Sequence, residues 1–351
     1  MMKKVLRLAA KAAGRTSPNP MVGAVLVKGG KIIAEDYHRK PGTPHAEALV
    51  IQKAREKSKG ATLYVNLEPC CHTDKRTPPC TMAIINAGIK KVVIGMKDPN
   101  PKVSGKGIEK LKKAGIEIVS GILEEDAKKL NEAYIKYITT GKPFVTLKVA
   151  MTLDGKIATP EGESKWITGE KARREVHKLR GSVDAIMTAI GTVKVDDPQM
   201  TARGKGAKSP KRIIIDPALE IPLDAKILQT PPETIIITEN TGNKAKKLEE
   251  TGIKLIHYNG KLDLKWLMEK LSKMEITSVL IEGGSSLNAH AFEDNIVDKV
   301  MFFIAPKIIG GKESFSAVGG ISFRKLAEAY QIKDIKLKRV GEDILVEGYL
   351  K

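Results

Sequence analysis

The stretch LEPCCHTDKRTPPC, residues 67–80, holds all three cysteines of the 351-residue chain and one of its six histidines. Cysteines gathered in one short segment do not resemble a disulfide framework, and in a reducing compartment they indicate a metal site or catalysis. The segment starts where the strand-like run TLYVNL ends, and it closes on two prolines and a helical pattern. We therefore predict a loop that joins a strand to a helix and carries a thiolate at each end.

A third ligand is offered by HAE, residues 45–47, which opens a helical pattern just after Pro44. Zinc prefers neutral imidazole and thiolates, and three protein ligands leave its fourth position open for water. Such a zinc lowers the pKa of the water to ~7, and a carboxylate beside it can take and return protons. His45 and Glu47 can both reach the space beyond the helix end, because helical side chains lean toward the N-terminus.

The end of the loop places the last cysteine at a helix start. Thr77-Pro78-Pro79-Cys80 is typical of an N-cap followed by proline at the first helical position. The positive helix end favours a thiolate at Cys80. Each cysteine taken singly could be a small buried hydrophobe, but H-x-E, then P-C, then a cysteine at a helix start is a joint pattern. Zinc deaminases that act on nucleic acids carry P-C-x-x-C; here Thr73 occupies that position, so the second thiolate must come from Cys80.

Composition and charge narrow the class of protein. Hydrophobic residues make up 42% and charged residues 29%, as in ordinary globular proteins. No apolar run approaches the ~20 residues that cross a bilayer, and Arg7 and Lys11 interrupt any signal-like stretch, so we expect a cytoplasmic protein without a membrane partner. The net charge of +19 is compatible with a nucleic-acid partner, a lysine-rich solvated surface or attraction of phosphorylated ligands. The lysines are spread without a basic block, so we expect no nucleic-acid partner.

A length of 351 residues favours two domains, and both parts of the chain alternate strand and helix patterns, as in α/β folds. Gly29-Gly30 separates the two strands of a predicted hairpin, VGAVLV (22–27) and KIIAE (31–35). An amphipathic helix is expected at the N-terminus, with further helices at 45–57, 78–87, 106–114 and 124–137 and strands at 62–67, 91–96 and 116–119. Gly141 and Pro143 then stop the last helix. We therefore predict domains at 1–143 and 144–351.

The second part predicts a larger sheet. Its strand candidates are DAIMTAI, KRIIID, ETIIIT, IKLIHY, TSVLIEGG and VMFFIAP, followed by a hairpin in RVGEDILVEGYL, and its helical patterns fall at 168–180, 243–251, 263–274 and 285–293. The second part lacks the G-x-G-x-x-G of a dinucleotide-binding Rossmann fold. IEGGSSL (281–287) instead places glycines and serines between a strand and a helix, which suits a phosphate and equally suits a plain turn.

The chain resembles the family of bifunctional riboflavin-biosynthesis deaminase/reductases along essentially its whole length. Its first part is similar to the deaminase domain in SPNPMVGAV, HAEAL, LEPCCHTDKRTPPC and DPNPKVSGKG. Its second part is similar to the reductase domain in FVTLKVAMTLDGKIAT, GESKWITGEKARREVHKLR, GTVKVDDPQMTAR, IEGGSSL and IAPKIIGG. The resemblance implies a three-layer α/β/α cytidine-deaminase-like domain followed by a dihydrofolate-reductase-like α/β domain, and a homo-oligomer.

For the first domain, the resemblance implies deamination of a phosphoribosylated diaminopyrimidinone with one Zn²⁺ bound by His45, Cys70 and Cys80. Glu47 is then the catalytic proton carrier, and Cys71 is a packing residue. Substrate contacts are expected from Asn19, His72, Asp98 and Asn100, with Lys75 or Arg76 on the phosphate. The loop between His72 and Thr77 is one residue longer than the family pattern, which leaves the choice between Lys75 and Arg76 open.

For the second domain, the resemblance implies NADPH-dependent reduction of the ribose of the deaminated product to a ribityl chain. The cofactor contacts it implies are Ala150, Trp166, Thr192, Asp196, Gly284, Ser285, Ser286, Leu287, Asn288, Ala289 and His290. The substrate contacts it implies are Ser164, Arg180, Met200, Arg203 and Glu282, with Lys148 and Asp154 near the same strand end. Arg180 and Arg203 are candidate phosphate clamps, because guanidinium groups bind phosphate oxygens in pairs.

Two other functions make different demands on the sequence. A tRNA adenosine deaminase would use the same zinc chemistry, but it would ordinarily carry P-C-x-x-C and would not need the second part of the chain. A zinc-stabilised nucleic-acid binding module would close its metal site with a fourth ligand, Cys71 or His72, and would give no reason for Glu47.

Overall fold

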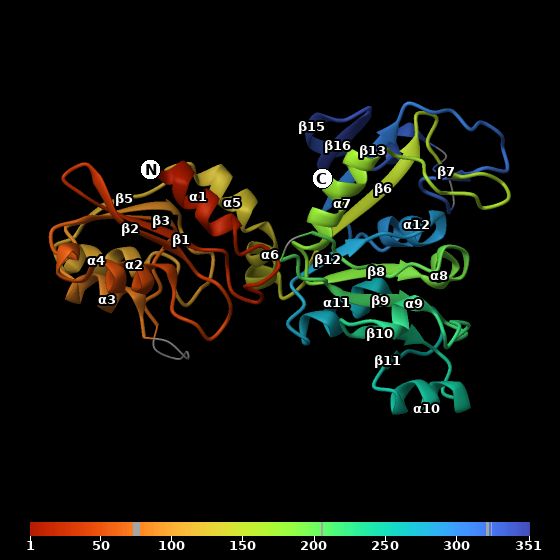
Figure 1. Ribbon diagram of the computed structural model, residues 1–351, viewed down its shortest axis with the longest axis horizontal. Helices are drawn as coiled ribbons and strands as arrows, with labels where there is room; N and C mark the ends of the chain where they lie inside the picture. Colours follow the sequence, from red (N-terminus) through yellow and green to blue (C-terminus); the bar gives the residue numbers. More distant parts are fainter. Residues whose placement is uncertain (73–77, 205, 321–322, 324) are drawn as a thin grey trace. The chain divides into compact units, whose positions relative to one another are not determined.

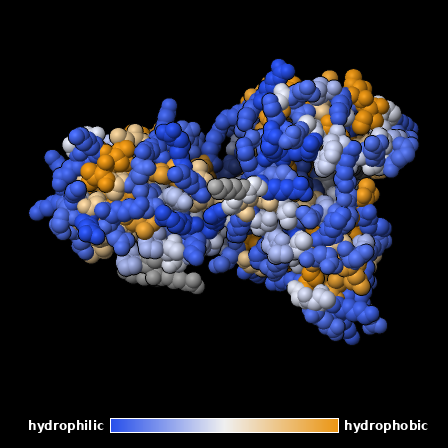
Figure 2. Space-filling model, viewed as in Figure 1, coloured by the Kyte–Doolittle hydropathy of each residue, from blue (hydrophilic) through white to orange (hydrophobic). Residues whose placement is uncertain are grey.

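The structure, a computed structural model, describes all residues except 73–77, 205, 321–322 and 324. The chain divides into unit 1, Met1–Lys142, and unit 2, Pro143–Lys351. Each unit has its own hydrophobic cores, and the visible surface of both is mainly hydrophilic with separate apolar patches (Figure 2). Among the described residues, no helix is both long and apolar enough to span a membrane.

Unit 1 is built on a five-stranded sheet in the order β2-β1-β3-β4-β5 (Figure 1). The strands are β1 (Gly23–Lys28), β2 (Lys31–Tyr37), β3 (Thr62–Leu67), β4 (Lys91–Met96) and β5 (Glu117–Val119). β1 is antiparallel to β2 and β3, whereas β3, β4 and β5 are parallel. Because Leu67 pairs with Met96, the segments that follow β3 and β4 leave the sheet at the same edge.

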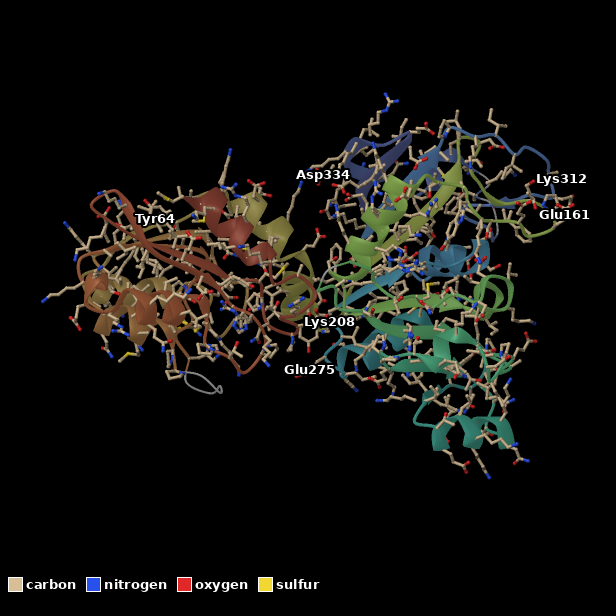
Figure 3. All side chains as sticks on the ribbon, viewed as in Figure 1. Tyr64, Glu161, Lys208, Glu275, Lys312 and Asp334 are labelled. Atoms are coloured by element: carbon tan, nitrogen blue, oxygen red, sulfur yellow. The ribbon has the colours of Figure 1, made fainter. Side chains whose placement is uncertain are left out.

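Helices cover both faces of this sheet, which gives the predicted three-layer arrangement. α1 (Met2–Ala10) and α5 (Glu124–Leu130) lie on one face, where Val5 and Leu8 pack on Val25, Val93 and Tyr64, the last labelled in Figure 3. α2 (Ala46–Ala54), the short η1 (Arg55–Ser58), α3 (Cys80–Asn86) and α4 (Lys106–Lys113) lie on the other. Because successive side chains of a strand point to opposite faces, one set packs on α1 and α5 and the other packs on α2, α3 and α4.

Two helix boundaries in unit 1 differ from the prediction. The helix expected at 124–137 is interrupted at Asn131, whose φ of −108° and ψ of 22° are not helical, and it continues as α6 (Glu132–Thr140). α3 starts at Cys80 with Pro79 as its N-cap, not at Pro78 after Thr77. A residue before proline avoids the helical region, so Pro78 cannot begin the helix while Pro79 follows it. Thr77 lies outside the described residues.

Unit 2 contains a nine-stranded sheet in the order β11-β10-β9-β8-β12-β6-β13-β16-β15 (Figure 1). The strands are β6 (Phe144–Thr152), β8 (Ala185–Ala189), β9 (Lys211–Ile215), β10 (Thr234–Thr238), β11 (Lys254–His257), β12 (Ser278–Ile281), β13 (Lys299–Ala305), β15 (Ile332–Val340) and β16 (Asp343–Leu350). The pairs β13–β16 and β16–β15 are antiparallel and the others are parallel. β7 (Lys156–Ala158) and β14 (Phe315–Ser316) form a separate two-stranded sheet.

Helices also cover both faces of the large sheet. α11 (Leu264–Ser272) and α12 (Ser285–Glu293) pack on one face, and α8 (Ile190–Asp196), α9 (Lys226–Gln229) and α10 (Asn243–Glu250) pack on the other. α7 (Glu170–Arg180) packs on β13 and β16, and η2 (Leu326–Glu328) is a single short turn. α8 and α9 were not predicted from the sequence, because segments of seven and four residues are too short to show a helical period.

The sheet of unit 2 opens beside β6. β12 ends at Ile281, opposite Leu147, while β6 continues to Thr152 and pairs there with β13. The chain after Ile281 turns away into α12, so Lys148 and Ala150 lie where two neighbouring strands part. A ligand crevice at the carboxyl ends of parallel strands is the usual outcome of this topology.

Candidate active sites

His45, Cys70 and Cys80 come together in unit 1, with one ligand atom of each within 4.8 Å of the others. The Nδ1 atom of His45 lies 3.6 Å from the sulfur of Cys70 and 3.3 Å from the sulfur of Cys80. His45 is the N-cap of α2, Cys70 follows β3, and Cys80 is the first residue of α3. One imidazole nitrogen and two sulfurs are a donor set that zinc prefers. The chemistry of these atoms therefore fits a zinc site with an open position.

Glu47 lies in the first turn of α2, beside this cluster, with only 3% of its surface exposed. Its Oε2 atom has no hydrogen-bond partner in the part of the chain that the structure describes. Burial raises the pKa of the Glu47 carboxyl, and the charge of Cys70 adds to this, against the opposing effect of His45. A buried carboxylate oxygen without a partner is costly, which fits a group that receives a ligand or a metal-bound molecule.

His38 links a predicted substrate residue to the metal cluster. Its Nε2 lies 3.2 Å from the Nδ2 of Asn19, and its Nδ1 lies 3.2 Å from the carbonyl oxygen of Pro44. Its ring meets that of His45 edge to face, with centroids 5.2 Å apart. Burial lowers the pKa of His38, so the neutral form accepts from Asn19 and donates to Pro44. His38 was not predicted from the sequence; the one signal for it is that a second histidine lies seven residues before His45.

Asp98 and Asn100 follow β4 at the sheet edge that also carries Cys70. The Oδ1 of Asp98 accepts the N–H of Asn100 at 2.9 Å and the hydroxyl of Tyr134 at 3.0 Å. Burial raises the pKa of Asp98 to about 6, and the negative charges of Glu68 and Cys70 add to that effect. Asn100 is half-buried, and its Oδ1 accepts the N–H of Lys102 at 3.0 Å.

Glu68 lies between β3 and Cys70 and connects the segments that follow β3 and β4. It was not predicted as a site residue. Its carboxylate is 2% exposed and accepts three backbone N–H groups, from Asp98 at 3.1 Å, Gly105 at 2.9 Å and Ile108 at 3.0 Å. A β-carbon on Gly107 would lie 2.2 Å from the carbonyl oxygen of Pro69, so α4 can approach only with glycine there. Glu68 thus fixes α4 and the segment that carries Asp98.

The structure describes only part of the remaining cysteine loop. Lys75 and Arg76 lie outside the described residues, so the choice between them stays open. His72 is half-buried. Cys71 is half-buried too, with its sulfur 3.9 Å from the carbonyl oxygen of Lys102, and it is not one of the three clustered ligands.

In unit 2, Glu282 follows β12 directly and forms ion pairs with the side chains of Arg180 and Lys148. The Nε of Arg180 donates to its Oε1 at 2.7 Å, the Nη2 of Arg180 donates to its Oε2 at 3.0 Å, and the Nζ of Lys148 lies 2.7 Å from Oε2. Burial alone would raise the pKa of Glu282, but Lys148 and Arg180 hold it far below its usual range. Because Glu282 occupies the fork of Arg180, this arrangement does not leave Arg180 free to clamp a phosphate in the way expected from the sequence.

The segment after α8 is held against α7. The Nη1 of Arg180 donates to the carbonyl oxygen of Thr201 at 3.2 Å, and the Nδ1 of His177 lies 3.2 Å from the same oxygen. Met200 is buried with a φ of 51°, and its sulfur lies 3.8 Å from Arg180. Arg203 is exposed. His177 was not predicted.

The cofactor contacts expected around IEGGSSL fall on one helix end. Gly284 is the N-cap of α12, and a β-carbon on it would lie 4.0 Å from the Oγ1 of Thr192 in α8. Ser285 lies 3.4 Å from Ser316, oxygen to oxygen, and Ser286 is exposed. The remaining members turn inward or lie further along the helix: Leu287 and Ala289 are buried in the core, Asn288 donates to the carbonyl oxygen of Ala317 at 2.8 Å, and His290 lies 3.2 Å from Asp294.

The other expected contacts of unit 2 come from the segments that follow β6 and β7 and from the end of α8. Trp166 is 63% exposed, with the guanidinium of Arg173 4.6 Å from its ring centre. Ser164 donates to Asp196 at 3.3 Å, and Lys165 lies 3.1 Å from the same carboxylate. Asp154 accepts the hydroxyl of Thr152 and the N–H groups of Ile309 and Gly310, and these bonds lower its pKa. The exposed Trp166, the N-terminal ends of α8 and α12 and the positive charges of Lys165 and Arg173 suit the binding of a dinucleotide.

Comparison with known families agrees with this division. Residues 1–96 match the family described as the cytidine and deoxycytidylate deaminase zinc-binding region. Residues 143–346 match the RibD C-terminal domain. A zinc-binding deaminase domain followed by a reductase domain confirms the predicted fold class, and it is consistent with Zn²⁺ and NADPH as the cofactors.

Full-length relatives carry both parts in the same order. Riboflavin biosynthesis protein RibD from Aquifex aeolicus is 47% identical over 347 residues, which cover 98% of this chain and 96% of the relative. The Escherichia coli protein of that name is 39% identical over 359 residues, covering 98% and 96%. A crystal structure of a diaminohydroxyphosphoribosylaminopyrimidine deaminase/5-amino-6-(5-phosphoribosylamino)uracil reductase from Thermotoga maritima matches with a TM-score of 0.88 at 39% identity, covering 100% and 97%. The chain therefore belongs to the RibD family of bifunctional enzymes, which combine deaminase and reductase activity in riboflavin biosynthesis.

Proposed function

We propose that unit 1 deaminates 2,5-diamino-6-ribosylamino-4(3H)-pyrimidinone 5′-phosphate and that unit 2 then reduces the ribosyl chain of the product to ribityl. The activities in the name of the Thermotoga maritima relative support this substrate pair. The observation that carries the proposal is the buried carboxylate oxygen of Glu47, which has no hydrogen-bond partner in the described part of the chain and lies beside the three clustered ligands of unit 1. A purely structural zinc site would have no use for that carboxylate.

In the proposed deaminase site, His45, Cys70 and Cys80 hold the zinc. Zn²⁺ held there would lower the pKa of a water and so supply a nucleophile near neutral pH. Glu47 would accept a proton from the attacking water and return it to the departing amino group. Its burial suits both steps, because a raised pKa brings the carboxyl closer to the working pH.

In the same proposal, the substrate is bound by residues that surround the metal-ligand cluster. Asn19 is held by His38, and Asp98 is held by Tyr134 and by its own turn, so both present fixed polar groups. Asn100 and His72 complete the pocket. Lys75 or Arg76 binds the phosphate, a role that suits a cation in a long loop.

We assign residues 1–143 to the deaminase and residues 144–351 to the reductase. When bound, NADPH supplies the hydride. Ala150, Thr192 and the start of α12 lie at the opening of the sheet, where the backbone N–H groups of Gly284, Ser285 and Ser286 suit its phosphates. Trp166 and Asp196 contact other parts of the cofactor. The remaining contacts come from α12, at Leu287, Asn288, Ala289 and His290.

The substrate side of the reductase site is proposed around Glu282. Lys148 and Arg180 keep this carboxylate ionised, so Glu282 acts as a hydrogen-bond acceptor for the hydroxyls of the ribose. Ser164, Met200 and Asp154 shape the rest of the site. The exposed Arg203 is then the better phosphate clamp, because the fork of Arg180 is occupied.

We also propose a cytoplasmic homo-oligomer that binds this small phosphorylated pyrimidine and neither nucleic acid nor membrane. Support for self-association comes from one face of the β15–β16 hairpin, marked by Asp334 in Figure 3, where Ile335, Leu337 and Ile344 are 58%, 71% and 45% exposed. Replacing Leu337 with Glu should lower the mass measured by light scattering. An unchanged mass would remove this surface from the proposal.

The proposal is tested by incubating the zinc-loaded protein with the diaminopyrimidinone nucleotide. Ammonia should appear first, and addition of NADPH should then give oxidation of the cofactor. Ammonia without oxidation would leave only the deaminase half standing. Robust deamination of a tRNA anticodon stem-loop, with none of the pyrimidine nucleotide, would refute the proposed substrate.

A further inference from the structure

Asn131, between α5 and α6, is tied to a segment 110 residues away in the sequence. It is 2% exposed, its Oδ1 accepts the N–H of Met21 at 2.8 Å, and its Nδ2 donates to the carbonyl oxygen of Met21 at 3.1 Å. Asparagine before a helix usually caps it, yet this side chain makes no cap on α6. The amide of Asn131 is therefore used for Met21.

The contact with Met21 fixes the segment that carries Asn19. The carbonyl oxygen of Met21 also accepts the Nδ2 of Asn66 at 2.9 Å, and the N–H of Asn19 donates to the carbonyl oxygen of Thr16 at 2.7 Å. Both polar groups of Met21 are thus bound two residues after Asn19. Side-chain amides that bind a peptide on both sides leave it little freedom to rotate, so the direction of Asn19 is set from α6 as well as from His38.

Tyr134 is one helical turn further along and reaches the other predicted substrate segment. Its ring is buried, and its hydroxyl donates to the Oδ1 of Asp98 at 3.0 Å. Asn131 is the N-cap of α6, and Tyr134 lies in the first turn of that helix. The N-terminal end of α6 therefore binds the segment of Asn19 and the side chain of Asp98 at the same time.

α6 lies outside the residues that define the deaminase family match. That match covers residues 1–96, and it includes the metal cluster and Asn19 but neither Asp98 nor α6. α6 is also the last helix of unit 1, ending at Thr140 just before the division at Lys142. The chain thus adds a helix after the zinc-binding region and uses it to hold polar groups on two separate segments.

We propose that Asn131 and Tyr134 are positioning residues for deamination: neither touches the substrate, and they act through Asn19 and Asp98. The proposal rests on the assignment of Asn19 and Asp98 to the substrate in the proposed function. A buried amide and a buried phenol cost stability unless they are bonded. Their presence at the N-terminal end of α6 is explained by the two segments that they hold.

The test uses the full-length, zinc-loaded enzyme and two double-mutant cycles on kcat/KM for ammonia release. One cycle combines Tyr134→Phe with Asp98→Asn, and the other combines Asn131→Ala with Asn19→Ala. Each single variant should lower kcat/KM roughly tenfold or more, as expected when a hydrogen bond at a buried polar site is lost. Within each cycle the second change should add little, because partners in one network are not additive.

Tyr137→Phe is the matched control. It removes a tyrosine hydroxyl from the same helix, one turn beyond Tyr134. It should leave kcat/KM unchanged. Zinc content and the NADPH-dependent activity of unit 2, supplied with deaminated substrate, should stay at the wild-type level in every variant. If Asn131→Ala loses zinc, the mild Tyr134→Phe cycle decides by itself.

Additive losses in the cycles would overturn the positioning role and leave the proposed function intact. Equal activity of Tyr134→Phe and Tyr137→Phe would do the same. Full activity of both Asn19→Ala and Asp98→Asn would instead remove the substrate assignment on which the inference stands. Loss of activity in the single variants with non-additive cycles is the result we expect.

Discussion

Removal of the Glu68 carboxylate should destabilise unit 1 selectively. Glu68 is 2% exposed and accepts three backbone N–H groups, from Asp98, Gly105 and Ile108. A hydrogen bond to a charged group contributes about 1.5–3 kcal/mol. Such terms add imperfectly, and water can reach part of the space that Glu68→Ala would leave. We therefore expect a loss of about 3–6 kcal/mol, a large share of the ~5–15 kcal/mol by which a domain is stable.

The sequence provides an assay that separates the two units. Both tryptophans, Trp166 and Trp266, lie in unit 2, so tryptophan fluorescence in urea follows that unit alone. Release of zinc to a chromogenic chelator follows unit 1, where the metal ligands lie. Glu68→Ala should move the zinc-release midpoint to lower urea and leave the fluorescence midpoint in place. Glu68→Gln should give a smaller shift, because one acceptor oxygen remains while the new NH₂ group faces a backbone donor.

Glu109→Gln is the control for charge alone. Glu109 lies on α4, the helix that Glu68 holds, but it is exposed and pairs with Lys113. Exposed ion pairs contribute little, so its zinc-release midpoint should match that of the wild type. If Glu68→Ala shifts the midpoint no further than Glu109→Gln does, the three hydrogen bonds do not support unit 1 as argued.

Three further outcomes are expected. Glu47→Gln should keep zinc, measured by metal analysis, but abolish ammonia release; retained activity would rule out the proton role. Cys80→Ser should lose zinc, whereas Cys71→Ser should keep it, because the Cys71 sulfur is outside the ligand cluster; equal zinc content in the two variants would contradict this division. Because burial raises the pKa of Asp98 from 3.8 to about 6, the folded state binds this proton more tightly, so the unfolding free energy of unit 1 should fall as pH rises between those values, by at most about 3 kcal/mol. Asp98→Asn should remove that fall in urea titrations, and an unchanged pH profile would show that Asp98 is not its source.

The metal cluster could be predicted from the sequence because its chemistry is carried by residue type and local spacing. A histidine and a glutamate two residues apart at a helix start, and cysteines after a strand and at a second helix start, leave few alternatives to zinc. The expected strands were also found, since β3, β4 and the strands of unit 2 are short apolar runs with clear ends. Each of these patterns can be recognised within a few consecutive residues of the chain.

The residues that support the site left no such signal. Asn131 acts on Met21 across 110 residues, and Tyr134 acts on Asp98 across 36. An asparagine and a tyrosine in a helical pattern look like ordinary surface or core residues until the fold places their partners. The break at Asn131 was missed for the same reason, because no proline or glycine marks it. Glu68 could be read only as part of the cysteine loop, since its three partners are backbone groups that carry no sequence identity.

The buried glutamates Glu47 of unit 1 and Glu282 of unit 2 have pKa values that are shifted in opposite directions. Glu47 has one carboxylate oxygen without a hydrogen-bond partner among the described residues, and burial raises its pKa. Glu282 is held ionised by Lys148 and Arg180, and its lowered pKa means that it cannot donate a proton near neutrality. The proton that accompanies hydride transfer in unit 2 must therefore come from another group or from water. The surroundings of the two carboxylates thus shift their pKa values in opposite directions, a difference that sequence motifs do not reveal.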